Sequence, residues 1–216
     1  MHNNVLDIWD ATTDNDDQAI VIPDGCCDLI FKFRPGQEPV WFLSHLAETT
    51  QTVPMFKGDF FKGYRLRPGT SVDMEKLLRA VAGQFPINRD NSDNIVDLIN
   101  DYTIHRMQTE DALLCLASGV GTVGQAATNL GVSSRTLQRY IVRETGKSPV
   151  FWHRLARVRR AGRDIEQANS LAEFAFDHGF SDQAHMNREF KQWFSLSPRN
   201  FAKVSRQQNV FQSGYG

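Results

Sequence analysis

Two sets of polar side chains in the C-terminal half have the residue types that read DNA bases. Arg135, Gln138 and Arg139 recur at helical spacing, on the side opposite Leu137 and Ile141. An Arg side chain can donate two hydrogen bonds to guanine, and a Gln side chain can pair with adenine. Each such contact is worth ~1–3 kcal/mol of base discrimination. The pattern predicts a helix whose outer face contacts the major groove.

The second set follows 49 residues later in the chain. Here Met186 and Phe190 are expected to face inward. The outward residues are Gln183, Ala184, Asn187 and Arg188, with His185 beside them. Arg188 matches Arg139, whereas Ala184 replaces Arg135 and can offer only a methyl contact. We therefore expect the second set to read fewer bases than the first.

Both sets belong to a repeated helical unit. Residues 122–131 align with residues 170–179 at an offset of 48. Each copy opens with a capping box, formed by Thr122 with Gln125 and by Ser170 with Glu173. A glycine turn and a second helix follow, the latter predicted for residues 134–145 in the first copy. This order is typical of a helix-turn-helix, and two copies suggest contacts with two stretches of major groove.

A single long helix is predicted between the copies, over residues 149–168. Ser148 caps it, and Pro149 occupies the first turn, where its missing N–H costs nothing. The expected buried stripe consists of Phe151, Leu155, Val158, Gly162 and Ile165. At a rise of ~1.5 Å per residue this helix would span ~30 Å. Successive major grooves on one face of DNA lie ~34 Å apart, so its length suits a spacer.

The charges are divided unevenly along the chain. Residues 1–118 contain 10 Lys and Arg against 18 Asp and Glu, and residues 119–216 contain 14 against 7. A basic C-terminal half predicts a polyanionic partner, although on charge alone the two halves could equally attract each other. Candidate phosphate contacts are Lys147, Lys191 and Arg199, with Lys203 and the connecting-helix residues Arg154, Arg157, Arg159, Arg160 and Arg163. An Arg-rich helix by itself is more often a solvated face.

The N-terminal half changes from strand-like to helical patterns. Cys27, Leu29, Phe31 and Phe33 alternate with Asp28, Ile30 and Lys32, as the two faces of a half-buried strand would. Further strands are expected at residues 39–43, 52–56 and 60–66, and helices at 73–81, 92–107 and 110–117. Residues 1–18 are rich in Asn and Asp and are expected to be frayed at their start, and residues 118–121 are expected to form a seam between the domains. The predicted class is α+β: a β-rich domain over 1–118, with a helical tail from about 73 to 118, and an all-α domain over 119–216.

The C-terminal region resembles the AraC-type transcriptional regulators. The matching residues are Ala126-Ala127, Gly131-Val132-Ser133, Leu137-Gln138-Arg139, Thr145 to Pro149, Ala172, Ala175, Gly179-Phe180, Phe190-Lys191, Phe194, Ser197-Pro198 and Phe201. The resemblance implies a seven-helix double helix-turn-helix domain that binds promoter DNA and activates or represses transcription. By position, its base readers would be Arg135, Gln138, Arg139, Gln183, Ala184, Asn187 and Arg188. Ala184 and Ser195 depart from the family pattern, the latter at a turn where many members have Gly.

The N-terminal half more weakly resembles the small β-sheet sensor domains that precede this region in some members. Residues 23–31 and 63–69 carry that resemblance. It implies a small-molecule effector or a homodimer contact there, and RNA polymerase as a further partner beside double-stranded DNA. No motif names an effector, and no cofactor or metal is expected.

The three cysteines bear on two other classes of function, an enzyme and a thiol redox switch. DNA-alkylation repair proteins join a related helical region to a zinc site with four thiolates, but this chain has three cysteines. A thiol switch would need a stabilised thiolate, whereas Cys26 and Cys27 lie beside Asp24 and Asp28, which disfavour one. We therefore do not expect an enzyme. For the adjacent cysteines, a small buried strand residue is the better-supported interpretation, and an oxidant-sensing role for Cys26 and Cys27 stays open.

The amino terminus and the hydropathy bear on location. Residues 1–17 lack the basic and then apolar order of a signal peptide, and no apolar run approaches the ~20 residues of a membrane span. The sequence therefore favours a cytoplasmic protein without a membrane partner.

Overall fold

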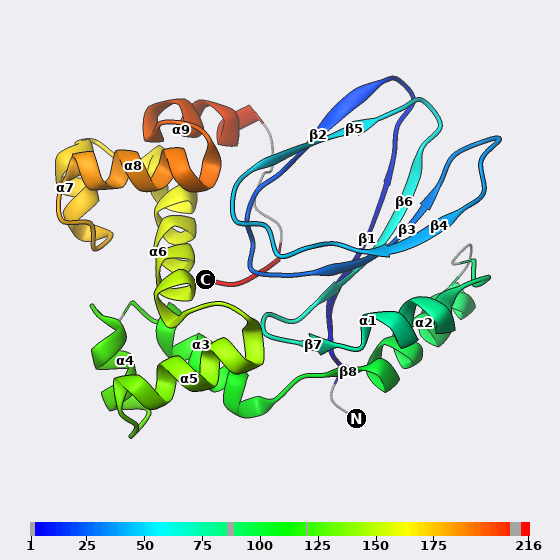
Figure 1. The fold of residues 1–216 in the computed structure, drawn as a ribbon. Coiled ribbons are helices and arrows are strands. Elements are labelled where there is room, and N and C mark those ends of the chain that lie inside the picture. Colours follow the sequence, from blue (N-terminus) through cyan, green and yellow to red (C-terminus); the bar gives the residue numbers. More distant parts are fainter. Residues whose placement is uncertain (1–2, 86–88, 120, 208–212) are drawn as a thin grey trace. The chain divides into compact units, whose positions relative to one another are not determined.

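The computed structural model describes residues 3–85, 89–119, 121–207 and 213–216. Its contacts separate two compact units, whose elements are labelled in Figure 1. The sheet unit comprises Met1–Ala19, Cys26–Leu46 and Thr52–Arg106. The helical unit comprises Met107–Gly216 together with Ile20–Gly25 and Ala47–Gln51. The predicted class, β-rich first and helical afterwards, is confirmed.

The sheet unit is built on a four-stranded antiparallel sheet in the order β1-β6-β3-β4. Its strands are β1 (Val5–Thr12), β3 (Asp28–Phe33), β4 (Val40–Leu43) and β6 (Phe60–Leu66). Two shorter pairs accompany it: β2 (Asp17–Val21) with β5 (Gln51–Met55), and β7 (Ser71–Val72) with β8 (Thr103–Ile104). The strands expected at 39–43, 52–56 and 60–66 are confirmed within a residue or two.

Two helices, α1 (Met74–Val81) and α2 (Arg89–Tyr102), cover one face of this sheet. The shared core consists of Val5, Leu29, Tyr64, Leu66, Leu77, Val81, Ile95 and Ile99. Asp73 caps α1 by accepting a hydrogen bond from the Lys76 N–H at 3.3 Å. The helix expected at 92–107 ends earlier, because Thr103 and Ile104 leave it to pair with Val72 and Ser71.

The amino-terminal segment contains two strands that the sequence did not predict. Fraying was expected at its start and no strand was expected within residues 1–18, yet β1 pairs with β6 along its length and Asp17 begins β2. The acidic residues Asp7 and Asp10 hide the strand pattern in the sequence. The Trp9 ring lies over Gly63, where a Cβ would come within 2.0 Å of it, so the pairing depends on a distant glycine.

The helical unit contains the repeated elements at the expected places. Its helices are α3 (Met107–Ala117), α4 (Val123–Asn129), α5 (Ser134–Thr145), α6 (Pro149–Asp164), α7 (Leu171–Asp177), α8 (Gln183–Phe194) and α9 (Pro198–Gln207). Figure 1 shows α4 and α5 near one end of α6, and α7 and α8 near its other end. The two copies match in length: α4 and α7 have 7 residues each, and α5 and α8 have 12.

The connecting helix α6 is shorter than predicted. It has 16 residues and continues as a 3-10 turn, η1 (Ile165–Gln167), instead of reaching residue 168 as an α-helix. Ile165 is buried and η1 packs against α9. At this point the backbone changes from α-helical to the narrower 3-10 geometry. Of the predicted stripe, Leu155, Val158, Gly162 and Ile165 are buried and Phe151 is half-buried, whereas the buried Trp152 was not foreseen.

The division between the units also differs from the expected seam. It falls between Arg106 and Met107 instead of near residue 118, because α3 packs against α4, α5 and α6. Leu113 and Leu116 of α3 are buried. The expected seam at 118–121 includes Val120, which lies outside the described residues.

A short segment, Ser213–Gly216, docks within the helical unit. Tyr215 is 4% exposed, and its ring lies edge-on to Trp152 of α6 at 4.9 Å between centroids. Its hydroxyl donates to the Leu113 carbonyl at 2.9 Å, and its backbone N–H donates to the Asp24 carbonyl at 2.8 Å. This segment therefore joins α3, α6 and residues 20–25.

Candidate nucleic-acid interface

The first candidate element is the α4–α5 pair. Thr122 caps α4 by accepting a hydrogen bond from the Gln125 N–H at 3.1 Å, as one half of the expected capping box requires. Gly131 makes the turn with a φ of 67°, a conformation that glycine adopts at low cost. Ser133 then caps α5 through the Thr136 N–H at 3.1 Å. These local bonds fix where α5 begins.

The outer face of α5 presents the side chains singled out in the sequence. Leu137 and Ile141 are buried, whereas Arg135, Gln138 and Arg139 are exposed on the opposite side. The structure thus brings the three predicted base readers of the first copy together on one solvent face.

The inner side of α5 is held by hydrogen bonds to neighbouring helices. The Tyr140 hydroxyl lies 3.0 Å from the Thr109 hydroxyl of α3. The Trp152 indole N–H of α6 donates to the Thr145 hydroxyl at 2.9 Å. Both contacts lie behind the exposed face and leave its side chains available to a ligand.

The second candidate element is the α7–α8 pair. Ser170 caps α7 through the Glu173 N–H at 3.4 Å, and Gly179 makes the turn with a φ of 74°. Asp182 caps α8 by accepting from the His185 N–H at 2.6 Å. Gln183, Ala184 and Arg188 are exposed, and Asn187 is half-buried. The second copy therefore presents a similar but less charged face.

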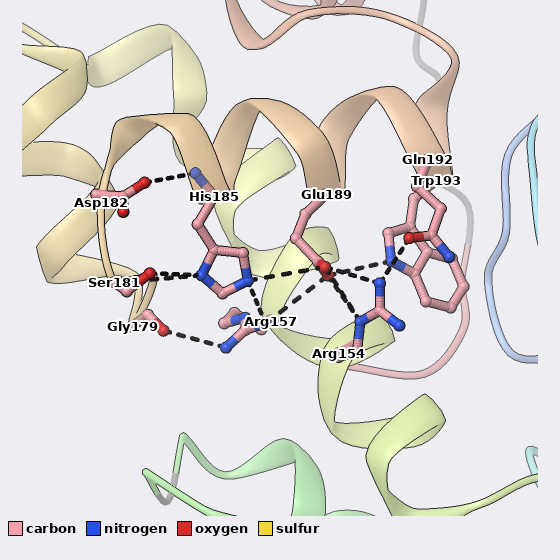
Figure 2. A network of polar contacts seen from close by, with 9 residues as sticks. All are labelled: Arg154, Arg157, Gly179, Ser181, Asp182, His185, Glu189, Gln192 and Trp193. Carbon is pink, nitrogen blue, oxygen red and sulfur yellow. Dashed lines mark hydrogen bonds and ion pairs between the residues drawn. The ribbon is translucent and has the colours of Figure 1, made fainter.

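A buried carboxylate ties α8 to the connecting helix (Figure 2). Glu189 is 5% exposed and follows directly after Arg188. Arg154 of α6 donates to it through Nη2 at 2.7 Å and through Nε at 3.1 Å. Arg157 Nη2 lies 3.7 Å from the same carboxylate. Burial lowers the pKa of Arg157, and the charge of Glu189 opposes that shift.

His185 belongs to this network and not to the exposed set. Its Nδ1 lies 3.1 Å from the Ser181 hydroxyl, and its Nε2 lies 3.8 Å from the Glu189 carboxylate. Figure 2 shows the imidazole directed toward Arg157, whose Nη2 lies 3.5 Å from Nε2. The structure therefore separates His185 from the other residues expected to read bases.

The basic residues expected to contact phosphates have different surroundings. Arg159 is fully buried and donates to the Pro23 carbonyl at 3.0 Å, so its assignment as a phosphate contact is wrong. Arg160 donates to the Ala117 carbonyl, and burial lowers its pKa. Lys147 forms an ion pair with Glu48. Lys191 and Arg199 are exposed. The Arg-rich α6 is thus largely a structural helix, because its arginines bind protein carbonyls and carboxylates.

The structure also bears on the alternatives raised by the cysteines. Within the described ranges, no group of three or more His, Cys, Asp and Glu side chains is placed to hold a metal ion. Cys26 is buried and Cys27 half-buried just before β3 begins, and Cys115 is half-buried on α3. In the same part of the chain, no helix is both long enough and apolar enough to cross a membrane.

Comparison with known proteins agrees with this geometry. A family described as a helix-turn-helix domain matches residues 126–203. Over 78 residues the chain is 31% identical to the HTH-type transcriptional activator RhaS of Pectobacterium carotovorum subsp. carotovorum (strain PC1). This match covers 36% of this chain and 28% of that protein. Over 81 residues it is 33% identical to a probable thc operon regulatory protein of Rhodococcus erythropolis. That match covers 36% of this chain and 24% of that protein. The chain thus matches about a quarter of each relative's length.

Similar solved structures include a transcriptional regulator with an AraC-type DNA-binding domain from Chromobacterium violaceum. It has a TM-score of 0.42 and 22% identity, and the match covers 46% of this chain and 93% of that one. ToxT from Vibrio cholerae O395 has a TM-score of 0.47 and 11% identity, and the match covers 91% of this chain and 96% of that one.

The paired helices and the matched residues together define a helix-turn-helix domain in the C-terminal region. Over residues 126–203 this region is similar to AraC-type transcriptional regulators, and the resemblance noted in the sequence is confirmed there.

Proposed function

We propose that this chain is a sequence-specific DNA-binding transcriptional regulator in which α5 and α8 enter successive major grooves. The observation that carries the proposal is the matched pair of exposed faces on α5 and α8, with Arg139 and Arg188 at equivalent positions. Each arginine lies on the face opposite a buried apolar stripe, and an Arg there can bind guanine through two hydrogen bonds.

The base readers proposed for α5 are Arg135, Gln138 and Arg139, and those for α8 are Gln183, Ala184, Asn187 and Arg188. Lys191 and Arg199 are the proposed phosphate contacts, because both side chains are exposed near the second pair. Lys147 could join them only by leaving Glu48. His185 would act at the interface through its effect on α8, since its ring nitrogens face protein groups.

The sheet unit is proposed to bind a small-molecule effector or a second copy of the chain, and RNA polymerase is a proposed partner of the whole protein. Support comes from the resemblance of residues 23–31 and 63–69 to sensor domains. Selecting bound DNA from a random pool, with the full chain, would give the site and its half-site spacing. Recovery of sequences no more alike than the starting pool would contradict the proposed function.

Arg139→Ala provides the residue-level test. We expect it to reduce discrimination at one base pair by about 1–3 kcal/mol and to leave nonspecific binding nearly unchanged. Binding would be measured by titrating labelled duplexes that carry each base at that position. Arg143→Ala is the matched control, because Arg143 is exposed on the same helix but pairs with Glu144. An equal loss on every duplex, with a shallower salt dependence, would make Arg139 a phosphate contact instead.

A further inference from the structure

The residue that follows each matched arginine anchors its helix from behind. Tyr140 and Glu189 are equivalent in the repeat, since each directly follows Arg139 or Arg188. Tyr140 reaches Thr109 of α3, whereas Glu189 reaches Arg154 and Arg157 of α6. The two recognition helices are therefore held at the same position by different chemistry, one neutral and one ionic.

The anchor of α8 occupies both carboxylate oxygens. Oε1 accepts from Arg154, and Oε2 accepts from Arg154 Nε at 3.1 Å and from the Trp193 indole N–H at 3.4 Å. Arg154 also donates to Gln192 at 2.6 Å, one turn along α8 from Arg188. In Figure 2 the guanidinium of Arg154 lies between Glu189 and Gln192, so it contacts two points along α8.

This arrangement restricts rotation of α8 about its own axis. Consecutive residues on an α-helix point about 100° apart, so Arg188 and Glu189 face different directions. A roll that moved Arg188 would pull Glu189 out of its contacts with Arg154. A buried carboxylate without its cation is costly, so such a roll is strongly opposed.

We propose that Glu189, clamped by Arg154 and Arg157, is the positioning residue that sets base readout by α8, and that Tyr140 has this role for α5. The inference rests on the proposed function, because it assigns the residues that orient the two readers. It predicts that each anchor affects one half-site only.

The test compares Glu189→Gln with Tyr140→Phe in the full chain, on duplexes whose first or second half-site is scrambled. Glu189→Gln should reduce the preference for the intact second half-site by about tenfold, which corresponds to ~1.4 kcal/mol. Its preference for the intact first half-site should change by less than about twofold, because the energetic effects of distant, independent sites add to within a few tenths of a kcal/mol. Tyr140→Phe should give the reverse pattern with a smaller loss. Equal losses at both half-sites in either variant would overturn the assignment.

Arg154 supplies a second, independent measurement. If Glu189 acts through Arg154, the double variant Arg154→Met/Glu189→Gln should lose no more second-half-site preference than Glu189→Gln alone. If Arg154→Met instead weakened binding to all duplexes alike and reduced the salt dependence, Arg154 would be a phosphate contact and the clamp would be refuted.

Two outcomes separate this inference from the proposed function. A wild-type chain without preference for either half-site would remove the proposed function and the inference with it. A wild-type chain with preference that Glu189→Gln retained would remove only the inference. If Glu189→Gln did not fold, Arg154→Lys would replace it, because lysine keeps the charge without the forked donors. That variant should show a several-fold loss confined to the second half-site.

Discussion

Ser195 is a residue whose backbone carries a local cost. It ends α8 in the left-handed conformation with a φ of 59°, at the position where Gly146 ends α5 with a φ of 69°. A side chain in this region crowds the backbone, whereas glycine accepts it freely. Ser195 departs from the family pattern at a turn, and this turn lies directly after α8.

Ser195→Gly is therefore expected to raise the free energy of unfolding, by up to about 1 kcal/mol. The relief of the left-handed strain is partly offset by the larger unfolded-state entropy of glycine. Urea unfolding would measure it. The reciprocal control is Gly146→Ser, which should destabilise by about 1 kcal/mol through backbone strain alone, because nothing lies within 4 Å of a Cβ at Gly146. A lower stability in Ser195→Gly would contradict this explanation.

At the scale of elements, one ion pair joins two turns of the sheet unit. Arg34, next to the end of β3, donates to both oxygens of Asp59, which precedes β6, at 2.5 and 2.8 Å. Asp59 also accepts from the Phe56 N–H at 3.0 Å. The hydrogen bond from Arg34 is the main reason that the pKa of Asp59 is lowered to about 2. The carboxylate thus fixes the β5–β6 turn against the strand end.

This pair predicts how the sheet unit responds to acid. Because the folded pKa lies below the ordinary value, the stabilisation is present above about pH 4 and is lost as the pH falls toward 2. Asp59→Asn should lower stability at neutral pH and flatten its fall over that range, measured by urea unfolding at a series of pH values. Asp10→Asn is the control, since the Asp10 side chain is 66% exposed and its Lys62 partner is 3.9 Å away. An unchanged slope in Asp59→Asn would assign the acid sensitivity to other carboxylates.

At the scale of the whole molecule, segments far apart in sequence complete the helical unit. Asp24 and Gly25 precede β3, whereas Tyr215 is almost two hundred residues later, yet both lie against Tyr215. A Cβ at Gly25 would lie 2.7 Å from the Tyr215 Cβ, and Gly25 has a φ of 78°. Helix α6, which lies between the two helix pairs, is therefore packed against Gly25 and Tyr215, which are far apart in the sequence.

Tyr215→Ala tests this packing. Removing the buried ring should destabilise the helical unit by about 3–5 kcal/mol, as large-to-small core substitutions do. Tyr215→Phe keeps the ring and should cost only about 1 kcal/mol for the lost hydrogen bond to Leu113. Burial raises the pKa of Tyr215, so its contribution to stability is present below about pH 10 and falls at higher pH, which Tyr215→Phe should abolish. Urea unfolding near neutral and alkaline pH would measure both effects, and a Tyr215→Ala chain as stable as wild type would contradict the docking.

Some of this organisation could be predicted from local sequence. The bounds of α5, the caps at Thr122 and Ser170 and the exposed set around Arg139 followed from short-range rules of helix capping and periodicity. Strand β1 could not be predicted in this way, because its pairing depends on Gly63, more than fifty residues away. Asp28 was read as a polar strand position but is buried, since Arg65 pairs with it at 3.0 Å from the neighbouring strand β6.

The sequence by itself determined the repeat, its capped helices and the polar faces of α5 and α8, because these depend on contacts within a few residues. Only the tertiary structure decided what the charged residues of α6 do. Arg159 is buried and donates to the Pro23 carbonyl, and Arg154 is bound to Glu189. In the sequence, both look the same as arginines on the solvent-exposed face of a basic helix. A burial site for a charge is made by distant groups that offer it hydrogen bonds, and those groups meet only when the chain is folded.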